Sequence, residues 1–313
     1  MEERYNIREV ARLTGLTAAT LRKWEERYDI VRPLRLPNGY REYTRSDLAV
    51  LLWVKAKVDG GALVSAAASE LKERLEQGWI PNGDDLRQAQ LDKAANLLEA
   101  RREDLLTALL ERDPARVTTA LDGAFGALGL ETVLIDVVQE VLYEIGRLWE
   151  TGVISSFQEH YSTVLIRDRL LSLRSVVGPL SGPTFVTACL PGEQHELGAL
   201  TLGLLAARHG FQVTHLGYSP SPDGLQRALL DLRPEVMGLS VATAVQLQQA
   251  EDWIRSMGRL AAAEAPGSLV VVGGYGVRER ARWPEGIEFI PGSAREALAE
   301  IHLLLYRRSV GAH

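Results

Sequence analysis

The residues best suited to chemistry lie in a loop near position 195. His195 stands there with a carboxylate, Glu193, two residues before it, and the loop follows a short apolar run at 184–188. A carboxylate that accepts the N–H of one imidazole nitrogen fixes the tautomer and makes the other nitrogen a better metal ligand. A lone loop histidine is usually only a polar surface residue, so the interpretation of His195 as a metal ligand depends on its surroundings.

The positions of glycines and the single cysteine limit which cofactor or metal this part of the chain could bind. Gly273 and Gly274 follow a later apolar run, where missing side chains would admit a bulky ligand close to the backbone. No G-x-G-x-x-G follows the run at 184–188, so a dinucleotide site would lack its phosphate-binding turn. Cys189 is the only cysteine, which excludes an internal disulfide and any multi-cysteine zinc or iron–sulfur site. Histidine or carboxylate must therefore hold any bound metal.

Strand and helix patterns alternate in the last part of the chain, and these elements would position the loop. The short apolar runs lie at 184–188, 213–217, 236–240 and 269–274, with helical patterns between them. This alternation predicts a doubly wound parallel sheet of the Rossmann-like (flavodoxin-like) kind over residues 183–307. The ligand crevice of such a sheet lies at the carboxyl ends of its strands, where the polar and glycine residues are found.

The middle of the chain has a purely helical pattern. Apolar residues recur every three and four positions over 87–178, with breaks near Asp113-Pro114, 126–129 and 150–152. Short breaks favour antiparallel neighbours, so the segment predicts a four-helix bundle. The preceding residues, 78–86, contain two glycines and a proline and are typical of a linker.

Residues 1–77 predict a winged helix-turn-helix. Asn6 and Thr17 are suited to cap two short helices with a glycine between them, and an Asn38-Gly39 turn indicates a hairpin behind them. Residues 1–57 carry 12 Lys and Arg against 8 Asp and Glu, net +4, whereas the remainder carries 23 against 33, net −10. This pattern favours DNA binding. A solvated basic hairpin that binds nothing is the alternative, since the charge difference alone is weak support.

The composition is that of a water-soluble globular protein. The 313 residues are enough for two or three domains, and 46% hydrophobic and 24% charged residues exclude extended disorder or a fibrous repeat. The N-terminus lacks a basic-then-apolar signal, and no apolar run is long enough to span a bilayer. We therefore expect a cytoplasmic protein without a membrane partner.

The N-terminal part resembles the MerR family, because its helix-turn-helix and wing match the run TLRKWEERYDIVRPLRLPNGYREYTRSDLAVL. The resemblance implies double-stranded operator DNA as a partner. It implies that four residues lie at or near the major groove: Thr17, Thr20, Arg22 and Lys23. It also implies that two residues of the wing region meet phosphates: Arg41 and Tyr43.

The C-terminal part is similar to cobalamin-binding modules, whose motif residues stand here in the same order and spacing: Glu193, His195, Gly198, Ser240, Gly273 and Gly274. That family usually has aspartate where Glu193 stands, and glutamate keeps the carboxylate on a longer arm. The resemblance implies that His195 takes the lower face of cobalt in place of the cofactor's own benzimidazole. It also implies that the nucleotide tail enters the sheet beside Ser240 and the glycines. Imidazole is a suitable ligand for such a metal.

Trp149, nine residues and then Glu159-His160 resemble the W-x9-E-H motif of light-sensing MerR-type regulators of the CarH group. The resemblance implies that these three residues cap the upper face of adenosylcobalamin, where the 5'-deoxyadenosyl group lies. Alternatively, Trp149 is a core residue and Glu159-His160 an exposed pair. Glu150 stands where the best-known light sensors carry a histidine that can take the vacated cobalt site. Either the light product differs here or the light response is altered.

These resemblances imply a cobalamin-dependent, light-responsive repressor. We expect a homo-oligomer, from dimer to tetramer, that binds operator DNA in darkness and releases it when light cleaves the cobalt–carbon bond. One alternative is a regulator that senses cobalamin or another tetrapyrrole without photolysis, and another is a regulator that has lost the cofactor. Methyltransferases and mutases use the same cobalamin fold, but the sequence contains no substrate barrel, so we do not expect an enzyme.

Overall fold

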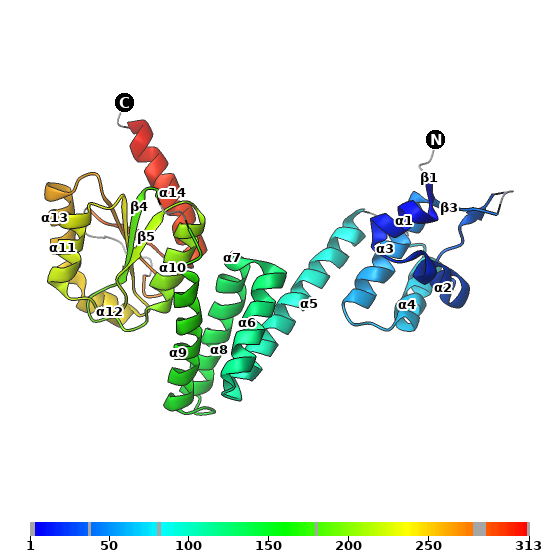
Figure 1. The fold of residues 1–313 in the computed structure, drawn as a ribbon, viewed down its shortest axis with the longest axis horizontal. Coiled ribbons are helices and arrows are strands. Elements are labelled where there is room, and N and C mark those ends of the chain that lie inside the picture. The colour runs from blue at the N-terminus through cyan, green and yellow to red at the C-terminus, as the bar shows by residue number, and fades with distance from the viewer. Residues whose placement is uncertain (1–3, 37–38, 80–82, 179–180, 278–285, 312–313) are drawn as a thin grey trace. The chain divides into compact units, whose positions relative to one another are not determined.

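The structure is a computed structural model that describes residues 4–36, 39–79, 83–178, 181–277 and 286–311. The chain divides into two compact units, Met1–Arg101 and Arg102–His313. The predicted fold class is confirmed: a winged helix-turn-helix, a helical bundle and a Rossmann-like sheet follow one another along the chain (Figure 1). In the described ranges, none of the helices combines the length and apolar character needed to cross a membrane.

The first unit contains a small antiparallel sheet and short helices. Its elements are β1 (Arg4–Asn6), α1 (Ile7–Thr14), α2 (Ala18–Tyr28), β2 (Leu34–Arg35), β3 (Arg41–Thr44), α3 (Arg45–Asp59) and α4 (Val64–Glu76). Asn6 and Thr17 cap α1 and α2 as predicted, and Gly15 ends α1 with a φ of 69°. β2 and β3 form the predicted hairpin, while its turn residue Asn38 lies outside the described residues. The sequence did not predict β1, which pairs with β3 and completes the order β1-β3-β2.

The bundle begins with a helix that is longer than predicted. Its elements are α5 (Gly83–Leu110), α6 (Pro114–Leu128), α7 (Leu130–Thr132), the π-helix η1 (Val133–Val138), α8 (Gln139–Glu150) and α9 (Ser156–Leu173). The predicted linker over 78–86 is wrong at its end, because α5 already begins at Gly83. The boundary between the two compact units lies within α5, and the bundle and the sheet share the second unit. Asp113 and Ser155 cap α6 and α9, so these predicted breaks are confirmed.

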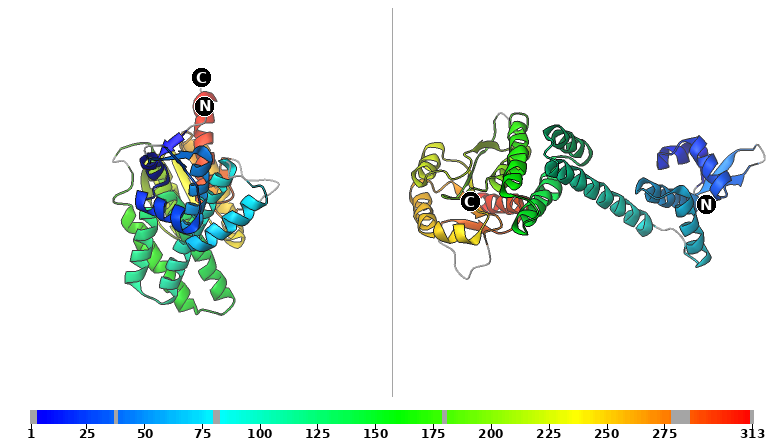
Figure 2. Two further views of the ribbon diagram at one scale, coloured as in Figure 1. Left: turned by 90° about the vertical axis from the view of Figure 1, so that its right-hand side faces the viewer. Right: turned by 90° about the horizontal axis from the view of Figure 1, so that it is seen from below.

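The sheet of the second unit is fully parallel. Its strands and helices are β4 (Thr184–Cys189), α10 (Leu197–Arg208), β5 (Gln212–His215), α11 (Pro222–Leu232), β6 (Val236–Ser240), α12 (Ala244–Gln249), α13 (Glu251–Glu264), β7 (Leu269–Gly273), β8 (Glu288–Ile290) and α14 (Ala294–Gly311). The strand order is β5-β4-β6-β7-β8. Helices α10 and α14 cover one face, and α11 and α13 cover the other (Figure 2). The direction of winding reverses beside β4 and β6, which places the ligand crevice at their carboxyl ends.

Candidate functional site

The loop after β4 holds the predicted histidine and carboxylate together. Glu193 is completely buried, and its Oε1 accepts from the backbone N–H of His195 at 2.9 Å and lies 2.6 Å from the Nδ1 atom of the same residue. Its Oε2 accepts from the backbone N–H of Ala242 at 2.9 Å, which ties the loop to the segment after β6. The His195 side chain is 70% exposed. Because Glu193 engages Nδ1, Nε2 is the imidazole nitrogen that can coordinate a metal.

The surroundings of Glu193 favour the charged form of its carboxylate next to the His195 imidazole. Burial by itself would raise the pKa of Glu193, but hydrogen bonds from the side chain and backbone of His195 and from Ala242 outweigh burial and lower it. The hydrogen bond to Glu193 raises the pKa of His195 against the opposing effect of burial, and the negative charge of Glu159 adds to the increase. Burial raises the pKa of the nearby Cys189 thiol to about 12, so this thiol is protonated at neutral pH.

The structure brings Gly198 and Ser240 together and gives the later glycines a packing role. A Cβ atom at Gly198 would lie 2.8 Å from Ser240 Oγ. At Gly274, whose φ is 110°, a Cβ atom would lie 2.6 Å from the Val241 carbonyl oxygen, and at Gly273 it would lie 3.1 Å from that of Ile290. Neighbouring backbone therefore occupies the place that a side chain would take at these two glycines, and their contact with a ligand stays a prediction.

The bundle contributes Glu159 to the surroundings of His195. Glu159 lies in the first turn of α9 and accepts a hydrogen bond from Thr163 Oγ1 at 3.1 Å. Its negative charge contributes to the raised pKa of His195, so the two side chains are close enough to interact electrostatically. Trp149, at the end of α8, is 48% exposed and His160 is also exposed, so neither is a core residue. Their contacts with a cofactor stay a prediction.

Exposed apolar side chains at the same sheet edge were missed by the sequence reasoning. Leu216 and Tyr218 follow β5, Val245 lies in the first turn of α12 after β6, and Tyr275 follows β7. Tyr275 also accepts a hydrogen bond from Gln139 of α8 at 2.6 Å. Apolar residues directly after strands, where polar turn residues are usual, were the signal that could have revealed them. Such a rim suits a large and partly apolar ligand.

These residues fit cobalamin better than a metal ion held by the protein alone. Among the described residues, no group of three or more His, Cys, Asp and Glu side chains could hold a metal ion. His195 can supply one nitrogen, so a metal bound there must bring its other ligands, as the cobalt of a corrin ring does. The exposed imidazole, its buried carboxylate partner and the apolar rim together satisfy this requirement.

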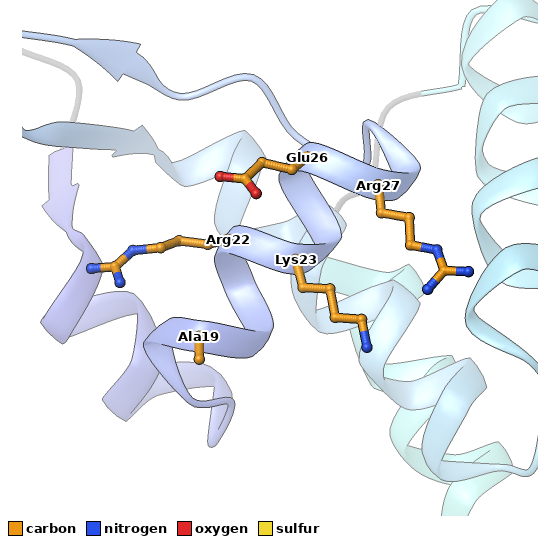
Figure 3. Close-up of a pocket in the computed structure, with 5 residues that line it drawn as sticks. All are labelled: Ala19, Arg22, Lys23, Glu26 and Arg27. Atoms are coloured by element: carbon orange, nitrogen blue, oxygen red, sulfur yellow. The ribbon is translucent and has the colours of Figure 1, made fainter.

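A second candidate site lies on α2 of the first unit. Leu21 and Trp24 on one face of α2 are buried in the core. The opposite face forms a shallow open depression lined by Ala19, Arg22, Lys23, Glu26 and Arg27 (Figure 3). At the start of the helix, the Thr17 and Thr20 hydroxyls lie 2.8 Å apart. Cationic and hydroxyl groups on an exposed helix face suit contacts with phosphates and base edges.

The two wing residues are less available than expected. Arg41 is mostly buried, and its Nε donates to Glu25 Oε2 at 2.7 Å. The Tyr43 side chain is 1% exposed, and its hydroxyl has no hydrogen-bond partner within the described residues. The prediction that Tyr43 contacts a phosphate is therefore wrong for this structure. The pairing of β3 with β1 and β2 turns the ring into the core.

Comparison with known protein families agrees with this division. A family model described as MerR HTH family regulatory protein matches residues 5–73. One B12 binding domain model matches residues 101–173, which include the bundle, and another matches residues 183–302, which include the sheet. The fold and the site thus define a MerR-type transcriptional regulator that binds cobalamin.

The chain is similar to two HTH-type transcriptional repressors of Myxococcus xanthus, CarH and CarA. It is 36% identical to CarH over 281 residues, which cover 88% of this chain and 91% of CarH. It is 33% identical to CarA over 276 residues, which cover 87% of each chain. The chain therefore belongs to this family of cobalamin-dependent, MerR-type transcriptional repressors.

A solved structure shares the fold of the cobalamin-binding part. The Methanosarcina barkeri monomethylamine corrinoid protein superposes with a TM-score of 0.55 and 13% identity, covering 66% of this chain and 99% of that protein. At this identity the likeness shows the fold alone.

Proposed function

We propose that this protein is a light-responsive repressor that uses adenosylcobalamin to control its assembly on operator DNA, and that it is not an enzyme. The observation that carries the proposal is the exposed His195, whose Nδ1 is held by a buried carboxylate. The same chain carries a basic helix face for DNA. Similarity to CarH and CarA over most of the chain supports a repressor.

Residues from both parts of the second unit would hold the cofactor. His195 would coordinate cobalt through Nε2, and Ser240 with the neighbouring glycines would hold the nucleotide tail. Trp149, Glu159 and His160 would cover the upper ligand. Adenosylcobalamin supplies a cobalt–carbon bond that light can cleave.

The proposed switch requires that contacts between bundle residues and the upper ligand of the cofactor stabilise one oligomeric assembly over the other. In darkness, Trp149 and Glu159 would have a partner that holds the bundle against the sheet, and the resulting homo-oligomer would present several DNA-binding units. Linked units bind DNA more tightly because each contact raises the effective concentration of the next. To shift the ratio of the two assemblies from 1:99 to 99:1, the two cofactor states must differ by about 5.5 kcal/mol in the free energy with which they favour one assembly. After light, Trp149 and Glu159 would lose that partner and the subunits would separate.

The proposal is tested by comparing the protein before and after green light. The purified protein is mixed with adenosylcobalamin in darkness, and its absorption spectrum, its mass by size-exclusion chromatography and its DNA affinity are recorded. The DNA probe is a duplex selected from a random-sequence library by the dark protein. We expect light to lower both mass and affinity. A spectrum that changes while mass and affinity stay constant would contradict the switch, and methylcobalamin provides the control for the adenosyl group.

The DNA-binding part of the proposal predicts different effects for two neighbouring residues. Arg22→Ala should weaken binding to the selected duplex by about tenfold or more and relax its sequence preference, because a guanidinium can read a base edge. Lys23→Ala should make the DNA affinity less dependent on salt, by the equivalent of about one phosphate contact, if Lys23 contacts the DNA backbone. Both are measured by fluorescence anisotropy at several salt concentrations. Lys72→Ala on α4 is the matched charge control, and an equal loss in all three variants would contradict a specific role for α2.

A further inference from the structure

An ion pair connects the bundle directly to the residue after His195. Arg167 of α9 donates through Nε to Glu196 Oε1, and the two side chains are 34% and 6% exposed. Glu196 stands immediately before α10 and is the neighbour of His195 in the chain. The hydrogen bond to Glu196 raises the pKa of Arg167, which keeps the guanidinium charged. The bundle therefore holds one end of the loop that presents His195.

The other oxygen of Glu196 is used within the sheet domain. Its Oε2 lies 3.4 Å from Nε2 of the buried His215 on β5, and His215 Nδ1 lies 2.9 Å from Thr187 Oγ1 on β4. Burial lowers the pKa of His215, so the imidazole is neutral at neutral pH and leaves Arg167 as the charged partner of Glu196. Glu196 thus joins α9 to the two strands that border the loop.

Helix α9 carries both Glu159 and the arginine that contacts the loop. Ser162, Ile166 and Leu170 of this helix are buried. Glu159 and Arg167 are eight residues apart, which is a little over two helical turns. The residue expected to touch the upper ligand and the residue that holds the histidine loop are therefore carried by one rigid element.

We propose that Arg167 is a positioning residue for His195, which couples the location of α9 to the geometry of the lower cobalt ligand. This inference rests on the proposed role of His195 in the function above. A displacement of α9 would separate Arg167 from Glu196 and leave a buried carboxylate without its charged partner. The loop would then lose the contact that fixes its end next to His195. Residues that support a metal ligand in this way tune its affinity without touching the metal.

The test compares two arginines of α9. Arg167→Met removes the guanidinium charge while keeping an unbranched apolar chain in place of the arginine's aliphatic part, and Arg167→Lys is the conservative variant. The matched control is Arg169→Met, because Arg169 is 32% exposed and is paired with Asp122 inside the bundle instead of with the loop. Glu196→Gln and the Arg167→Met/Glu196→Gln double variant complete a cycle for the pair.

Two measurements are made on the full chain. The first is the affinity and visible spectrum with hydroxocobalamin, a probe that does not depend on the adenosyl group or on light. The second is amide hydrogen exchange over residues 193–199 in the cofactor-free protein. For Arg167→Met we expect binding about tenfold weaker, a reduced spectral signature of histidine coordination and exchange about tenfold faster. Arg167→Lys should restore part of each effect, and Arg169→Met should resemble the unaltered protein.

Several outcomes separate this inference from the proposed function. Unchanged affinity, spectrum and exchange in Arg167→Met would overturn the positioning role, as would equal changes in Arg169→Met. The double variant should lose no more than the larger single loss, and additive losses would also contradict the coupling. If the unaltered protein binds hydroxocobalamin but does not respond to light, the proposed switch fails while the role of Arg167 is still decided by these data. If Arg167→Met does not fold, Arg167→Lys and Glu196→Gln carry the same comparison.

Discussion

Replacing His195 with alanine is expected to weaken cobalamin binding by at least tenfold and to remove the spectral signature of histidine coordination, while leaving the folded protein intact. The loss follows because Nε2 of His195 is the proposed cobalt ligand. The fold should persist because the imidazole is 70% exposed. The backbone N–H of residue 195, which donates to Glu193, remains in the alanine variant. Absorption spectroscopy and calorimetry measure the binding, and thermal unfolding measures the stability.

The informative result is the contrast between binding and stability. The free energy of unfolding of the cofactor-free His195→Ala protein should fall by only about 1.5 kcal/mol, because Glu193 loses one hydrogen bond but keeps the backbone N–H groups of residues 195 and 242. A variant that binds adenosylcobalamin with an unaltered visible spectrum would favour a regulator that senses cobalamin or another tetrapyrrole without ligation by His195. A protein that stays colourless even without the substitution would indicate that the cofactor has been lost.

Glu193→Gln is expected to lower both the free energy of unfolding and the affinity for cobalamin. The buried carboxylate accepts N–H groups at both oxygens, from His195 and from Ala242. A glutamine amide can accept at only one of these two positions, so a donor would face the NH2 group and lose its partner. An unsatisfied buried group costs about 1–3 kcal/mol, and the loss of the partner that orients a metal ligand weakens binding by about 10- to 100-fold. Chemical denaturation and cobalamin titration measure the two effects.

The neighbouring residue provides the control for Glu193. Gln194 is exposed and lies between the carboxylate and the imidazole in the chain. Gln194→Ala should therefore leave both measurements close to those of the unaltered protein. If Glu193→Gln unfolds at the same denaturant concentration and binds equally well, the carboxylate does not orient His195.

Much of the fold could be predicted because its signals are local. Caps such as Asn6 and Thr17 act within three residues, and the apolar runs mark the strands β4, β5, β6 and β7 wherever they pack. The short strands β1 and β8 were missed because each has only three residues and is defined by its partner strand. The end of the predicted linker was wrong because α5 begins at Gly83, and the low helix propensity of glycine gives no local sign of a helix start there.

The candidate site was predictable to the extent that its residues are close in sequence. Glu193 and His195 meet within one loop, so their pairing follows from spacing. The burial of Tyr43 was not predictable from spacing, because it depends on pairing with two strands at once. The pairing of Arg167 with Glu196 was also missed, since it joins residues 29 positions apart on separate layers.

The sequence by itself determined the class of each part, the helix caps and the carboxylate–imidazole pair, because these depend on periodicity and on neighbours along the chain. Only the tertiary structure decided that Glu159 lies within electrostatic range of His195, that Arg167 pairs with Glu196 of the histidine loop and that Tyr43 is buried. Those arrangements are set by how strands pair and helices pack across long separations in sequence, and local pattern carries little information about that packing.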